Sequence, residues 1–174
     1  MLLDRSPAEG EWSLRETLAH LIGVERSYRA NTQYSLSRTT AEPILMPTER
    51  RPAPDPAHTA GSIFDILDRF ATLRAETDDA VAGLSDAELG RPTVTAGFEV
   101  DVRYRLHRFA SHITEHTNQC AKTVGALGAT GGDARAICRR IGAMRGLHER
   151  RTDPAQLQAL DAALEERFKV AHVS

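Results

Sequence analysis

The stretch VRYRLHRFASHITEHTNQCAKTVGAL, residues 102–127, decides the fold class of this chain. Its apolar residues return at intervals of three or four, beginning with Val102, Leu106, Phe109 and Ile113, and this interval places them on one face of an α-helix. Gly128 follows and is typical of a helix end. The pattern predicts a long amphipathic helix over about residues 100–127.

Two earlier segments also have helical patterns. Ser13 and Glu16 have the spacing of a capping box, and the apolar residues that follow predict a helix over about residues 13–36. A second pattern predicts a helix over residues 63–81. Between them lie five prolines, which remove backbone donors and disfavour helix, so residues 37–61 are expected to form a long loop.

The region after the second predicted helix has no clear hairpin signal. Ser85 caps a short turn that ends near Gly90, and residues 91–98 are expected to form a connection. A short alternating patch there leaves a strand pair near residues 94–100 as a minor alternative.

Helical patterns continue beyond Gly128. A basic segment carries apolar residues from Ile137 to Leu147, and Asp153 with Pro154 has the pattern of an N-cap and first helical residue. The last helix is expected to span about residues 154–170. Together the patterns predict an all-α fold, a helical bundle formed by residues 1–128, with residues 129–174 as a helical extension packed on the same domain.

Composition and charge exclude several classes of protein. A chain of 174 residues suits a single domain, and a formal net charge of -2 gives no overall attraction to nucleic acid. No run of about 18 apolar residues predicts a membrane span, and the N-terminus becomes polar too early for a signal peptide. The two cysteines lack CxxC spacing, which is typical of a reducing compartment. We therefore expect a soluble, cytoplasmic protein.

His112 and His116 are the strongest candidate ligands for a metal ion. Four residues apart on a helix, they lie on the same face, and His20 on the 13–36 helix would supply a third imidazole. Three such ligands leave one position of a tetrahedral ion open for chemistry. The helical spacing places His116 inside the apolar stripe and His112 at its edge. The alternative is a pair of buried histidines held by hydrogen bonds.

Other residues near this helix have two interpretations each. Arg105 and Arg108 would bind an anionic substrate, or lie on a solvated face. Cys120 would add a thiolate ligand or, more simply, fill the core. Trp12 would pack at the start of the first helix or line a pocket.

Two motifs resemble the DinB-like, or YfiT-like, metalloenzyme superfamily. They are GEWSLRETLAHL at residues 10–21, with a histidine eight residues after the tryptophan, and HITEH at residues 112–116 with Gln119 three residues later. The resemblance covers about residues 8–128. It implies a four-helix bundle in which His20, His112 and His116 bind a divalent ion, most simply zinc, with nickel or iron as alternatives.

The resemblance also carries expectations about activity. The superfamily includes thiol-dependent S-transferases and a mycothiol-dependent isomerase, which implies a small-molecule thiol, an electrophilic substrate and a homodimer. Lys122 and Lys169 are the only lysines among many arginines, which favours mycothiol as the thiol. Gln119 would orient a ligand. Glu16 is the nearest candidate base, and the alternative is that it serves only as a helix cap.

Two features depart from the superfamily pattern. Only about a dozen residues precede the tryptophan motif, so the first helix of the family is expected to be absent. Its place would be taken by a helix such as 154–170 or by a partner subunit. The alternative to an enzyme is a non-catalytic helical interaction or dimerisation protein with a structural or vestigial metal site.

Overall fold

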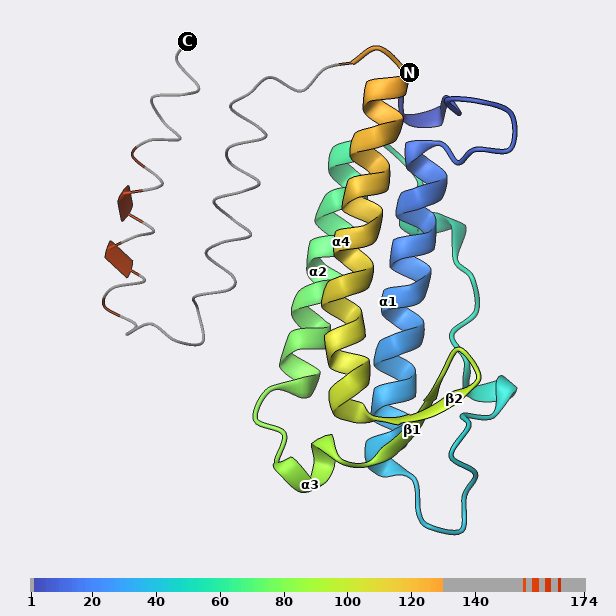
Figure 1. The fold of residues 1–174 in the computed structure, drawn as a ribbon, viewed down its shortest axis with the longest axis vertical. Coiled ribbons are helices and arrows are strands. Elements are labelled where there is room, and N and C mark those ends of the chain that lie inside the picture. Colours follow the sequence, from blue (N-terminus) through green and yellow to red (C-terminus); the bar gives the residue numbers. More distant parts are fainter. Residues whose placement is uncertain (1, 130–154, 156–157, 160–161, 164–165, 167–174) are drawn as a thin grey trace. The chain divides into compact units, whose positions relative to one another are not determined.

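Three long helices form the main body of the fold. In the computed structural model, residues 2–129 are described, together with positions 155, 158–159, 162–163 and 166. The long helices are α1 (Leu14–Ser37), α2 (Ile63–Val81) and α4 (Val102–Ala126), which lie side by side in Figure 1. The predicted all-α class is therefore confirmed.

Local sequence signals set the helix starts. Ser13 and Glu16 form the predicted capping box: the Ser13 hydroxyl accepts from the Glu16 amide at 3.3 Å, and the Glu16 carboxylate accepts from the Ser13 amide at 2.8 Å. Ser62 and Asp65 form the same arrangement at the start of α2. Each box satisfies backbone donors that a helix start otherwise leaves unpaired.

The core lies where α1 packs against α2 and α4 (Figure 1). Its buried apolar side chains are Leu18, Leu21 and Ile22 of α1, Ile66 and Leu73 of α2, and Leu3 from the short helix η1 (Leu2–Asp4). Burial of each such side chain contributes about 1.5–3 kcal/mol. Because α1 packs against both other helices, side chains from α1 and α4 can meet across their shared interface.

The predicted loop between α1 and α2 returns along α1 (Figure 1) and contains two short 3-10 helices, η2 (Thr48–Arg50) and η3 (Pro56–Thr59). Arginines of α1 and α2 form hydrogen bonds to carbonyls in the second half of this loop. Arg26 donates to the Ala53 carbonyl at 2.9 Å, Arg69 donates to the His58 carbonyl at 3.1 Å, and Arg15 donates to the Gly61 carbonyl at 3.1 Å. Side-chain donors thus replace the backbone bonds that the prolines remove.

A β-hairpin precedes α4, and the prediction of a plain connection at residues 91–98 is wrong. Strands β1 (Pro92–Thr95) and β2 (Phe98–Asp101) pair antiparallel, which confirms the minor alternative of a strand pair. The two-residue turn has φ values of 50° at Ala96 and 83° at Gly97. Such turns usually have the sequence Asn-Gly or Asp-Gly. Here alanine takes the first position, so the sequence lacks the usual hairpin pattern.

The hairpin also moves the start of α4. Residues to Asp101 belong to β2, and the Asp101 carboxylate accepts from the Tyr104 amide at 2.7 Å, so the helix begins at Val102 rather than near residue 100. The buried guanidinium of Arg105 donates to the Thr93 hydroxyl at 2.7 Å and to the Val94 carbonyl. This side chain ties α4 to β1.

The boundary of the compact unit that contains these elements is Gly128, and residues 129–174 form a second unit. The helices predicted around residues 137–147 and over 154–170 fall almost entirely outside the described residues, so their packing stays a prediction. None of the helices in the described part of the chain has the length and apolar character needed to cross a bilayer.

Candidate metal centre

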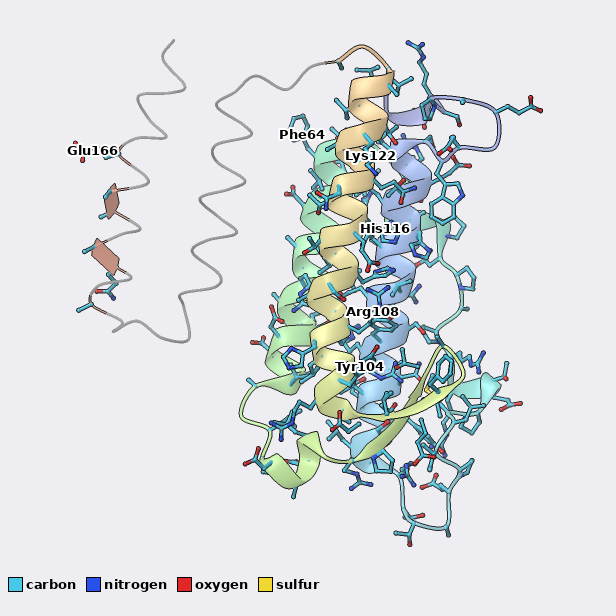
Figure 2. All side chains as sticks on the ribbon, in the orientation of Figure 1. Phe64, Tyr104, Arg108, His116, Lys122 and Glu166 are labelled. Carbon is cyan, nitrogen blue, oxygen red and sulfur yellow. The ribbon has the colours of Figure 1, made fainter. Side chains whose placement is uncertain are left out.

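Three histidine side chains meet between α1 and α4. His20 comes from the second turn of α1, and His112 and His116 come from neighbouring turns of α4, where Figure 2 labels His116. The Nε2 atom of His112 lies 3.2 Å from that of His20 and 3.1 Å from that of His116. The predicted ligand set is therefore brought together in one cluster, and its ligand atoms all lie within 4.8 Å of one another.

These separations fit a tetrahedral ion. With zinc–nitrogen bonds of about 2.0–2.1 Å, two ligands of a tetrahedral site lie about 3.3 Å apart. The measured distances of 3.1 and 3.2 Å are close to this value. Little movement of the imidazoles would be needed to bind an ion of this size.

Hydrogen bonding alone satisfies the cluster poorly. The Nδ1 of His116 lies 2.7 Å from the Gln119 Oε1, so His116 donates there in the tautomer that keeps Nε2 unprotonated. His112 Nε2 carries at most one proton when neutral and has two nitrogen neighbours. One proton on His112 therefore cannot form a full hydrogen bond in both contacts, whereas a cation would attract the lone pairs of all three nitrogens.

The pKa values favour neutral imidazoles. Burial, followed by the charges of His116 and His20, lowers the pKa of His112 to about 4. Burial and then His116 also lower the pKa of His20. Because a metal ligand must be a deprotonated imidazole, the lowered pKa values keep His20 and His112 in their binding form at neutral pH.

We expect the metal-free protein to lose stability on acidification from pH 6.5 to pH 4. Over this range the unfolded chain protonates His112 while the folded chain does not, so the free energy of unfolding falls with pH. The loss amounts to at most about 3 kcal/mol, since one pKa unit corresponds to about 1.4 kcal/mol. Urea unfolding of wild type and His112→Gln at several pH values measures it, and equal slopes in the two proteins would refute the assignment.

The orientation of the histidine pair differs from the prediction. His112 is buried at 7% exposure and His116 is half-buried, whereas the helical spacing places His116 in the stripe and His112 at its edge. The buried face of α4 runs through Arg105, Phe109 and His112. This face includes Arg105, a buried charged residue. A stripe drawn from the apolar residues alone therefore gives the wrong centre for the buried face of α4.

Trp12 covers the cluster. Its ring centroid lies 5.1 Å from that of His20 and 6.5 Å from that of His116, and the His116 ring is nearly parallel to it at 18°. The indole is 41% exposed. Of the two predicted roles, the contacts support a wall of the site, and they place the histidines near the protein surface.

Gln119 and Glu16 occupy different surroundings. Gln119 contacts His116 directly and fixes its ring, as a hydrogen-bond partner behind a metal ligand commonly does. Glu16 is exposed, and its carboxylate accepts from both the amide and the hydroxyl of Ser13 at 2.8 Å. These bonds lower the pKa of Glu16, so its contacts are those of a helix cap.

Arg105 and Arg108 also differ from each other. Arg105 is 2% exposed and bonded to the hairpin. Arg108 makes two bonds to the Glu115 carboxylate, at 3.0 and 2.9 Å, and lies one turn before His112 (Figure 2). Their predicted contact with substrate stays a prediction, and Arg108 is the better placed of the two. Half-buried Cys120 is outside the histidine cluster.

Tyr28 is a neighbour of the site that was not identified from sequence. Its ring lies 6.0 Å from the His112 ring, meets Phe109 edge to face at 5.1 Å, and lies under the Arg105 guanidinium at 5.5 Å. Its place in the helical pattern of α1 is the only sequence signal. The contacts show that Tyr28 supports the buried side of His112.

Fold and site define a class of protein: a helical bundle with a three-histidine cluster, backed by a glutamine, that is suited to a divalent ion. Residues 2–120 match the family model of the DinB superfamily, and the chain belongs to this family. No curated protein matches the chain.

Proposed function

We propose that this protein is a divalent-metal-dependent enzyme that transfers a small-molecule thiol to an electrophilic substrate. The observation that carries the proposal is the convergence of three histidines: the Nε2 atom of His112 lies 3.2 and 3.1 Å from those of His20 and His116, and the three ligand atoms lie within 4.8 Å of one another. Zinc is the preferred ion, and nickel or iron are alternatives because imidazole binds all three.

The donor set favours a catalytic site over a structural one. Structural zinc sites usually have four protein ligands, whereas catalytic sites have three and an open position. Within the described residues, only the three histidines gather as metal-capable groups. His20 and His116 are half-buried beside exposed Trp12, so a small molecule would reach the cluster without a large rearrangement.

A bound divalent ion would supply Lewis-acid chemistry by lowering the pKa of a thiol in the open position, so that a nucleophile exists at neutral pH. The protein's residues would position the reactants. Gln119 holds the His116 ring, and Trp12 offers an apolar wall to the thiol or its partner. Arg108, held by Glu115, is the nearest candidate for an anionic group of either substrate.

The proposal extends to the setting of the reaction. The thiol would be of the mycothiol type, and the protein would act in the cytoplasm as a homodimer. Glu16 would remain a helix cap, because its carboxylate is bonded to Ser13. The thiolate would then need no separate general base, because its proton passes to solvent.

Metal analysis with a thiol assay tests the proposal. We expect about one ion per chain in wild type and less than a tenth of that in His116→Ala, since removing one of three ligands abolishes stoichiometric binding. Plasma mass spectrometry gives the metal content. Alkylation of a small thiol by a chromogenic electrophile gives the activity, which should depend on the metal.

His107→Ala is the matched control, because His107 is an exposed histidine on the same helix. It should keep both metal and activity. Metal binding without thiol alkylation would favour the alternative, a helical interaction protein with a structural ion. Failure of wild type to bind zinc, nickel or iron would contradict the proposal.

A further inference from the structure

Residues of α1 and of the loop between α1 and α2 line a cleft that includes none of the three histidines. The loop runs alongside α1 in Figure 1. The volume of the cleft is about 320 Å³. Ala19, Ile22 and Gly23 of α1 line one side, and Pro52, Pro54 and Pro56 of the loop line the other. Ligand pockets span roughly 300–1,000 Å³, so the cleft suits a molecule of about one ring.

Contacts from two helices hold the loop side of the cleft. Arg26 of α1 donates to the Ala53 carbonyl, and Arg69 of α2 donates to the His58 and Ala60 carbonyls. The three prolines restrict φ in the same segment. A wall fastened in this way is formed before a ligand arrives, which reduces the entropy lost on binding.

Gly23 gives the α1 side its depth. Among the described residues, and outside the surrounding backbone of α1, no heavy atom lies within 4 Å of the place that a Cβ atom would take here. Glycine inside a helix is destabilising by about 0.5–1 kcal/mol relative to alanine, and no neighbour packs against its backbone closely enough to require it. Its effect on the structure is to leave room in the cleft.

Arg26 is the positively charged arginine that lines the cleft. One of its nitrogens is bonded to the Ala53 carbonyl, and among the described residues no carboxylate lies within ion-pair distance of it. Asp55, the acid that lines the same cleft, already accepts from the Ala57 amide at 2.9 Å and pairs with His58 at 3.1 Å. The guanidinium therefore has donors left for an anion.

We propose that this cleft is a binding site for a small aromatic carboxylate. The carboxylate would bind Arg26, which matches it as a planar donor. The ring would lie between the prolines and the Ile22 and Gly23 side of α1. The site does not depend on the metal centre, because none of the three histidines lines it.

Titration of 15N-labelled protein with sodium benzoate tests the proposal. Saturable shifts are expected for the amides of Gly23, Ala53 and Asp55. Benzamide lacks the charge, and acetate lacks the ring. Each should bind at least about tenfold more weakly than benzoate, because each loses either one charge-assisted hydrogen bond or one buried ring. Benzamide binding as tightly as benzoate would overturn the proposal.

Two pairs of variants localise the effect. Gly23→Leu should fill the cleft and abolish binding, whereas Gly125→Leu, at an exposed helical glycine that also has open space, should not. Arg26→Gln should weaken binding about tenfold, and Arg26→Lys should restore part of it. Lys122→Gln removes one positive charge from α4 and should have no effect.

Equal weakening in a variant and its control, or no saturable shift in wild type, would refute the site. Gly23→Leu keeps the test valid if Arg26→Gln disturbs the loop, since leucine has a higher helix propensity than glycine. His116→Ala should bind benzoate like wild type. This result would show that benzoate binding in the cleft does not depend on the histidine cluster. The metal proposal is tested separately, by metal content and thiol alkylation.

Discussion

Addition of zinc to metal-stripped protein is expected to raise the free energy of unfolding by about 4 kcal/mol when free zinc exceeds its dissociation constant 1,000-fold. In the folded state the Nε2 atom of His112 lies 3.2 and 3.1 Å from those of His20 and His116, close to the separations of a tetrahedral site, and the ligand atoms of all three lie within 4.8 Å of one another. In the unfolded chain, His20 is separated from His112 by 92 residues, so the site does not exist there. The rise in the free energy of unfolding therefore measures zinc binding to the folded state.

Chemical unfolding with and without zinc measures this gain. His116→Ala should show little of it, and His107→Ala should show all of it, because His107 is exposed on the same helix and outside the cluster. A similar gain in His116→Ala would mean that zinc binds elsewhere in the chain. Absence of a gain in wild type would argue against the ion site itself.

Replacement of Arg105 by alanine is expected to lower the free energy of unfolding by about 3 kcal/mol. The side chain is 2% exposed and donates to the Thr93 hydroxyl and the Val94 carbonyl. Its removal leaves these acceptors without their donor and opens a cavity beside Tyr28, and each effect costs about 1–3 kcal/mol. Urea unfolding measures the loss.

Arg103→Ala is the matched control, since Arg103 is exposed on the same turn and, among the described residues, forms its ion pair with exposed Asp86. Exposed pairs contribute about 0–1 kcal/mol, so this variant should be nearly neutral. Arg105→Met, which keeps volume, should fall between the two. A loss below about 1 kcal/mol for Arg105→Ala would mean that the stability of the fold does not depend on this contact with the hairpin.

The helices were predictable because their signals are local. Ser13 with Glu16 forms a capping box within four residues, and the predicted start of α1 differs from the observed one by a single residue. The hairpin was only a minor alternative in the prediction, because Ala96 holds a positive φ that alanine seldom adopts and the turn therefore lacks its usual sequence. Its pairing is stabilised by Arg105, a contact across 12 residues that no local pattern reveals.

The site was predictable in its ligands and less so in its surroundings. His112 and His116 share a helix face by spacing alone. His20 was a candidate on a separate predicted helix, and the resemblance to the superfamily placed it in the same ligand set. The burial of His112 and the contact of Tyr28 depend on how α1 packs against α4. The cleft depends on arginine bonds to loop carbonyls, which leave no pattern in the sequence.

The position of Trp12 gives the protein an internal optical reporter. The chain has a single tryptophan, and its ring lies against two of the three histidines. Its emission therefore arises from one known place, next to groups whose charge changes with protons and whose electrons would be drawn toward a bound cation. Occupancy of the centre can be followed in the unlabelled protein by the fluorescence of one side chain.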